Sequence, residues 1–210
     1  MNMKQLAKQL LILCAVFLTT IQAHAFLELN ETAELIPNDG KYRVGFFPQL
    51  YISNGGGTNF GAFMDMYVDD AVNARFTLGG GATDFWAGAS AKWVPFPDYH
   101  DQPALGFRGA FTYAYDNNQG SYNSQVTPIV SKVIETKFGK LNPYMGLPVT
   151  WVYVSSTSSF TAIQFVVGSE WLQSPDFQMG GELEMNMQNS TSALSVYFNF
   201  PFDEKTGFKK

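Results

Sequence analysis

The chain is poor in the residue types that most often carry chemistry. It has one cysteine and two histidines among 210 residues, and only 15% of its residues are charged, against about 25% in a typical soluble domain. One cysteine excludes a disulfide framework within the chain. The formal charge of −5 gives no reason to expect nucleic acid as a partner.

Long apolar runs and long helices are also missing. No segment after residue 25 approaches the 18 continuous apolar residues that a spanning helix needs, and 19 glycines with 10 prolines argue against a long-helix protein. Aromatic residues are abundant instead, at 16%. Such a composition argues against disorder, and the length allows one domain or at most two small ones.

Residues 1–25 have the three parts of a secretion signal. Lys4 and Lys8 are followed by an apolar stretch and by the small-x-small sequence that ends at Ala25. The apolar stretch is too short for a membrane anchor, and Leu13 before Cys14 argues against lipidation. Cleavage would leave 185 residues with no cysteine, one histidine, 11 basic and 18 acidic residues.

Strict alternation of apolar and polar residues dominates the remaining chain and predicts strands with two different faces. Residues 104–115 show it best, with large apolar side chains on one face and mostly small ones on the other. Turn residues divide 41–202 into ten segments, so we predict an all-β, antiparallel up-and-down barrel of about ten strands, with eight or twelve left open. The segments are 41–53, 59–69, 73–80, 84–95, 103–115, 125–138, 142–154, 159–172, 176–188 and 193–202.

Three stretches fall outside these segments. Residues 26–40 are interpreted as a polar periplasmic lead-in, residues 203–210 as a C-terminal tail, and residues 116–124 as a longer, asparagine-rich outer loop. The segment 125–138 has no cleanly apolar face, which a bulge would explain. We expect the acidic excess to lie in the lead-in, the turns and the tail.

The apolar face is predicted to point outward, into a membrane. The other face carries glycine, alanine, serine and threonine, which suit a narrow interior, and the strands have the length that a tilted membrane crossing requires. Aromatic side chains gather at strand ends, as in the aromatic girdles of membrane barrels. A soluble secreted barrel that binds a small hydrophobic ligand is the alternative, and it would have an apolar interior.

These features resemble the small outer-membrane β-barrel proteins of Gram-negative bacteria over the whole of 41–202. The signal peptide, the alternating strands, the strand that opens with KLNPY at 140–144 and the final strand that ends at Phe202 carry the resemblance. It implies location in the outer membrane, contact with its lipid, and insertion by the barrel-assembly machinery, which usually recognises a terminal aromatic. Here residues 203–210 follow Phe202.

The polar face places nearly balanced charges in the barrel interior. We interpret them as a salt-bridged plug, since a barrel of this size is filled, whereas open channels need about 16 strands. An ion or solute path, as in a porin, is the alternative. The predicted members are Arg43, Asp65, Asp69, Arg75, Lys92, Arg108, Glu170, Glu182 and Glu184; Lys132 and Glu135 cannot be assigned to a face.

Four aromatic residues are predicted to point inward in the outer half of the barrel, beside glycines: Phe47, Tyr51, Phe63 and Trp86. They would either line an apolar vestibule for a small hydrophobic ligand or simply fill the interior, and we favour filling on the same argument of barrel size.

Catalysis has little support in the sequence. His100 is the only histidine after residue 25, and it lies in a proline-rich turn between Asp98 and Asp101. An acid–base pair without a positioned nucleophile is weak support for an enzyme, and the residue types leave only carboxylates for a metal. We therefore expect a non-catalytic barrel of structural or transport type without a cofactor or metal, and a barrel enzyme that uses His100 as a further alternative.

Overall fold

The alternating segments form the wall of a closed antiparallel barrel. The computed structural model describes residues 28–36, 41–53, 56–137, 139–155, 159–172, 177–203 and 207. Among these residues no helix is long and apolar enough to span a membrane. The strands are β1 (Lys41–Tyr51), β2 (Gly57–Asp69), β3 (Val72–Gly81), β4 (Phe85–Phe96), β5 (Ala104–Asp116), β6 (Gln119–Ser131), β7 (Ile134–Thr136), β8 (Gly139–Gly146), β9 (Val149–Val154), β10 (Phe160–Leu172), β11 (Gln178–Gln188) and β12 (Ala193–Asp203).

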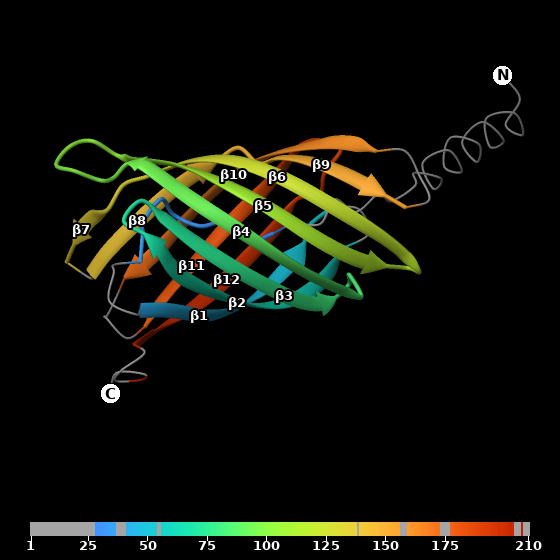
Figure 1. Ribbon diagram of the computed structural model, residues 1–210, viewed down its shortest axis with the longest axis horizontal. Coiled ribbons are helices and arrows are strands. Elements are labelled where there is room, and N and C mark those ends of the chain that lie inside the picture. Colours follow the sequence, from blue (N-terminus) through green and yellow to red (C-terminus); the bar gives the residue numbers. More distant parts are fainter. Residues whose placement is uncertain are drawn as a thin grey trace, which may run out of the picture.

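Ten strands make up the wall, as the sequence predicts. Successive strands pair with each other, and β12 pairs with β1, which closes the ring. The strands β8 and β9 share the same two neighbours, β6 and β10, and keep one register along them. They are one wall strand interrupted at Leu147 and Pro148, because proline cannot donate a ladder hydrogen bond. The short β7 continues β6 along β8 in the same register, so β6 and β7 likewise belong to one wall strand, interrupted at Lys132 and Val133 (Figure 1).

The two ends of the barrel are named here by their connections. The proximal rim holds the start of β1, the end of β12 and the β2–β3, β4–β5, β7–β8 and β10–β11 connections; the distal rim holds the β1–β2, β3–β4, β5–β6, β9–β10 and β11–β12 connections. Along every wall strand, buried side chains alternate with outward ones. The outward set is largely apolar, and Phe60, for example, is 65% exposed. The polar side chains are concentrated inside.

The prediction for the sixth strand was wrong. The error lies at its start: the strand begins at Gln119 rather than at 125 and continues through β7 to Thr136, and the expected outer loop at 116–124 does not exist. Instead, Asp116 pairs with Gln119 across a two-residue turn in which Asn117 and Asn118 have φ values of 49° and 62°. Asparagine tolerates this left-handed conformation, and such turns match the twist of a hairpin. The asparagines that suggested a loop therefore form a tight turn.

The lead-in was also placed wrongly. Residues 28–36 lie inside the barrel (Figure 1), where most of their side chains are buried. Leu29 packs with Trp86 and Ala114 near the distal rim, whereas Ala33 packs with Val94 and Ala104 near the proximal rim. The segment thus runs along the lumen toward the proximal rim, where β1 begins. Residues 28–36 are called the lumen segment below.

Glycine at position 79 makes room for the ring of Trp86. A Cβ atom there would lie 2.2 Å from Trp86 Cζ2 and 2.5 Å from the carbonyl oxygen of Phe60. We expect Gly79→Ala to lower the free energy of unfolding by about 1–3 kcal/mol, because overpacking forces side chain and backbone to move. Urea unfolding in lipid vesicles measures this. A Cβ at Gly109 would meet nothing within 4 Å, so Gly109→Ala should change stability by less than about 0.5 kcal/mol; equal losses would contradict the packing argument.

Candidate functional site in the lumen

One row of charges runs across three neighbouring strands. Arg43, Asp65 and Arg75 are direct cross-strand partners on β1, β2 and β3, so their side chains enter the lumen side by side. Arg75 donates to both carboxylate oxygens of Asp65, from Nε at 2.5 Å and from its second terminal nitrogen at 2.9 Å. Arg43 approaches Asp65 to 3.2 Å and Glu170 to 3.8 Å. Both guanidinium groups are thus paired in a buried site.

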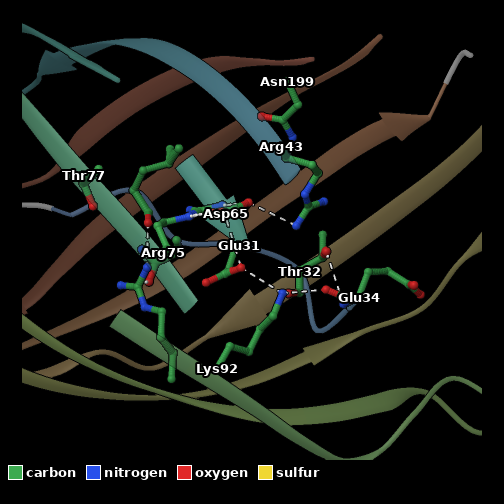
Figure 2. A network of polar contacts seen from close by, with 12 residues as sticks. Glu31, Thr32, Glu34, Arg43, Asp65, Arg75, Thr77, Lys92 and Asn199 are labelled. Carbon is green, nitrogen blue, oxygen red and sulfur yellow. Dashed lines mark hydrogen bonds and ion pairs between the residues drawn. The ribbon is translucent and has the colours of Figure 1, made fainter. Parts of the chain in front are cut away.

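The lumen segment completes this network (Figure 2). The Glu31 carboxylate lies 2.8 Å from Lys92 Nζ and 3.7 Å from Arg75. Lys92 Nζ also donates to the carbonyl oxygens of Thr32, at 2.8 Å, and Glu34, at 2.5 Å. Lys92 is 1% exposed, and a buried ammonium is tolerated only when its three donors find acceptors. Here the segment supplies them.

A second group surrounds Arg108 on β5, which is fully buried. Its guanidinium donates to the carbonyl oxygen of Leu29 at 2.7 Å, to Asn30 Oδ1 at 3.3 Å and to Gln125 Oε1 at 2.6 Å. The Glu28 carboxylate lies 3.9 Å away and also accepts hydrogen bonds from the hydroxyls of Thr77 and Thr112. This group again joins the segment to the wall.

Two carboxylates on β11 accept from neutral donors. Glu182 accepts the backbone N–H of Asn30 at 3.1 Å and the Tyr144 hydroxyl at 2.8 Å. Glu184 accepts the side-chain amides of Gln49 and Gln164, at 3.2 and 3.1 Å. A carboxylate can be stabilised in a low-dielectric site by such hydrogen bonds as well as by cations.

The wall strands alone carry equal numbers of buried basic and acidic side chains. Four buried bases face four buried acids, and Glu28 and Glu31 of the segment add two further carboxylates. These two residues were missed by the sequence analysis, which placed the acidic excess of the lead-in outside the barrel. The available signal was composition: residues 26–40 contain four acidic and no basic residues. The wall charges are Arg43, Arg75, Lys92, Arg108, Asp65, Glu170, Glu182 and Glu184.

Asp69 is not part of this network, contrary to the sequence analysis. The pairing of β2 with β3 shifts its register between Tyr67 and Asp69, which ends the alternation at the proximal rim. Asp69 is consequently exposed, and its carboxylate accepts the backbone N–H of Asp70 at 2.7 Å. Of the two residues left unassigned, Glu135 is exposed and pairs with Lys140, and Lys132 lies at the same rim.

The four aromatic residues for which filling and a vestibule were weighed lie in the interior. Phe47, Phe63 and Trp86 pack with Leu29 of the segment, and the ring of Phe47 reaches the position that a Cβ of Gly61 would occupy. Tyr51 lies apart from them, where its hydroxyl meets Asn59 and Thr83. A lumen cavity of about 10 Å³ beside Arg43 and Arg75 holds about one water molecule.

The turn that contains His100 is held by an ion pair. Lys132 Nζ donates to the Asp98 carboxylate at 2.6 Å and to the carbonyl oxygen of His100, and the backbone N–H of Val133 donates to Asp98. His100 is exposed, with φ of 51°, and its ring contacts that of Tyr99. The Asp98 carboxylate therefore stabilises the turn. Within the described ranges, no three or more histidine, cysteine, aspartate or glutamate residues gather to hold a metal.

Known proteins share the fold but not the sequence. No family model matches the chain, and no curated protein matches it. Among solved structures, the β domain of the Bordetella autotransporter BrkA matches with a TM-score of 0.53 at 8% identity, over 79% of this chain and all of that one. The N-terminal barrel of Pseudomonas aeruginosa OprF (TM-score 0.31, 9% identity, 78% and 98% covered) and Yersinia pestis Ail (0.31, 12%, 79% and 100%) also match. The match to the BrkA β domain supports a β-barrel architecture for this chain.

The Glu31–Lys92 pair should contribute strongly to stability. We expect Glu31→Gln to lower the free energy of unfolding by about 3 kcal/mol, because it leaves a buried ammonium without its carboxylate. Glu34→Gln is the matched control, since Glu34 meets Lys92 through its carbonyl oxygen, and it should cost less than about 1 kcal/mol. Urea titration of both variants in lipid vesicles compares them. Equal losses would show that the Glu31 carboxylate adds nothing specific.

The Asp98–Lys132 contact should make stability depend on pH in acid. Partial burial tends to raise the pKa of the Asp98 carboxyl, but the hydrogen bonds from Lys132 and Val133 prevail and lower it. The contact therefore stabilises the fold above the unfolded pKa of about 4 and is lost as the pH falls through the lower folded value. The stability difference between wild type and Asp98→Asn should be full at about pH 6 and shrink below about pH 4. A difference between wild type and Asp98→Asn that does not change with pH would contradict the assignment.

Proposed function

We propose that this protein is a non-catalytic outer-membrane barrel whose lumen is closed by its own N-terminal segment. The observation that carries the proposal is the arrangement of charge: every lumen cation contacts a wall acid, the lumen segment or both. A signal peptide at residues 1–25 would export the chain. The proximal rim, where β1 begins and β12 ends, would face the periplasm, and the distal rim would face outward.

The outward face supports a membrane location. Exposed large hydrophobic side chains occur on nearly every wall strand, and so many apolar side chains exposed to water are atypical of a soluble monomer. Aromatic side chains lie at both rims, as membrane barrels require at the two interfaces. Tyr42 contacts Phe202 and Trp93 contacts Phe107 toward the proximal rim, and Phe85 pairs with Tyr115 near the distal one.

The polarity of the interior argues against a soluble secreted barrel. A secreted barrel for a hydrophobic ligand would hold apolar surface inside and polar surface outside. In this structure the buried charges and amides lie inside and most of the large apolar side chains lie outside, which is the order of a membrane barrel. The aromatic cluster that would have formed the ligand site is filled by Leu29.

A structural role fits the closed lumen better than a porin-like one. A ten-stranded barrel is narrow. The segment packs against the wall both toward the distal rim, through Leu29, and toward the proximal rim, through Ala33. Transport would require the segment to leave, which would deprive Lys92 and Arg108 of the acceptors described above.

Planar-bilayer recordings test the closed state. Wild-type protein should show no steady conductance, and a variant lacking residues 28–36 should conduct measurably, because loss of the segment leaves a polar passage between the charged side chains of the wall. Heat-modifiable migration in SDS and sedimentation with outer membranes establish that each protein is a folded membrane barrel. Steady wild-type conductance equal to that of the deletion variant would refute the closed lumen, and solubility without detergent would refute the membrane location.

A further inference from the structure

We propose that the lumen wall is a binding site for an extended acidic peptide, which the lumen segment occupies in cis and which a separate peptide of the same chemistry can occupy in trans. The proposal deepens the proposed function, since it names the ligand class that the closed lumen recognises. The proposal requires that the wall make specific hydrogen bonds and ion pairs to a peptide, in addition to apolar packing. Three sets of contacts support this.

The wall first binds the main chain of the segment. Glu182 accepts the N–H of Asn30, and Ser131 Oγ accepts the N–H of Ala33 at 3.1 Å. Arg108 donates to the carbonyl oxygen of Leu29, and Lys92 donates to those of Thr32 and Glu34. Each extended peptide offers the same N–H and C=O groups, and recognition of this kind supplies affinity through the backbone. Wall side chains from β4, β5, β6 and β11 thus take the part that a neighbouring strand takes in a sheet.

The wall then selects side chains at four positions of the segment. Two positions take an acid: Glu28 lies beside Thr77, Thr112 and Arg108, and Glu31 beside Lys92 and Arg75. Leu29 packs into the aromatic cluster, and Ala33 packs against Val94 in a second buried cluster. The preferred ligand is therefore an extended peptide with the pattern acid, leucine, any residue, acid, any residue, small residue.

Finally, two wall cations depend on the occupant. Among the residues that the structure describes, the acceptors of Lys92 Nζ all belong to the segment, namely Glu31, Thr32 and Glu34. Arg108 donates to two oxygens of the segment and to Gln125, and its charge partner in the segment, Glu28, lies 3.9 Å away. A peptide that restores these contacts would return both cations to the acceptors that they have in the closed lumen.

Cutting the chain next to the segment tests the site in the otherwise complete protein. A specific protease sequence is inserted between Ile36 and Lys41, the protein is folded in detergent micelles, and the chain is cut. We expect the segment to stay with the barrel through gel filtration and to be replaced in a 1:1 ratio by a fluorescent peptide covering residues 26–36. Release of the segment without any saturable peptide binding, while the barrel keeps its heat-modifiable migration, would overturn the proposal and leave the membrane-barrel assignment intact.

Two altered peptides distinguish sequence-specific binding from nonspecific binding to the barrel. A Glu31→Lys peptide places a cation beside Lys92 and Arg75 and should bind at least about 100-fold more weakly than the native peptide. A Glu34→Gln peptide keeps the carbonyl that Lys92 uses and should bind within about threefold. Equal binding of all three peptides would overturn the proposal. If the cut barrel unfolds, cutting is repeated with excess native peptide: retention of the folded form supports the site, and unfolding despite the peptide overturns it.

Discussion

The structure depends on the neutralisation of buried wall cations by main-chain and carboxylate oxygens of the lumen segment. Lys92 is buried on β4, and its acceptors within the described part of the chain come from Glu31, Thr32 and Glu34. A lysine in such a position is costly unless its charge is paired and its donors are satisfied. The barrel and the segment therefore form one folding unit, in which the ring of strands holds the segment and the segment makes a charged interior tolerable.

This constraint organises the two halves of the lumen differently. Toward the distal rim the segment contributes Leu29 to a cluster of aromatic rings that glycines on neighbouring strands make room for. Toward the middle it contributes Glu28 and Glu31 to ionic groups built on β1, β2, β3, β4 and β5. The wall alone is balanced, so the segment brings extra negative charge into a site with several buried donors. Packing fixes its position, and hydrogen bonds fix its register.

The barrel could be predicted from the sequence because alternation is a local signal. Each wall strand has a period of two over ten or more residues, and the ten expected segments correspond to the ten wall strands. Eight of the nine predicted lumen charges point inward for the same reason. The errors occur where alternation stops: Asp69 follows a register shift, and Asn117 and Asn118 form a two-residue turn where a loop was expected.

The position of the lumen segment could not be predicted in this way. Its contacts are made with residues 44 to 152 positions away along the chain, and no periodicity in residues 26–40 indicates a partner. Many of the hydrogen bonds from the wall are made to main-chain N–H and C=O groups of the segment. Because every residue type has these groups, such contacts cannot be recognised from the side chains in the sequence. Only its acidic composition, set against the basic residues predicted inside the barrel, pointed toward the lumen.

An engineered disulfide tests most directly whether the segment lies in the lumen. An ideal Cβ at Gly106 would lie 3.5 Å from the Cβ of Ala33, which is within the range of disulfide-bonded cysteines, and the chain after residue 25 has no other cysteine. In the folded barrel, Ala33→Cys with Gly106→Cys should form an intramolecular disulfide on mild oxidation, whereas Ala33→Cys with the outward Gly109→Cys should not. Two free, reagent-accessible thiols in the folded Ala33→Cys, Gly106→Cys barrel would contradict the account.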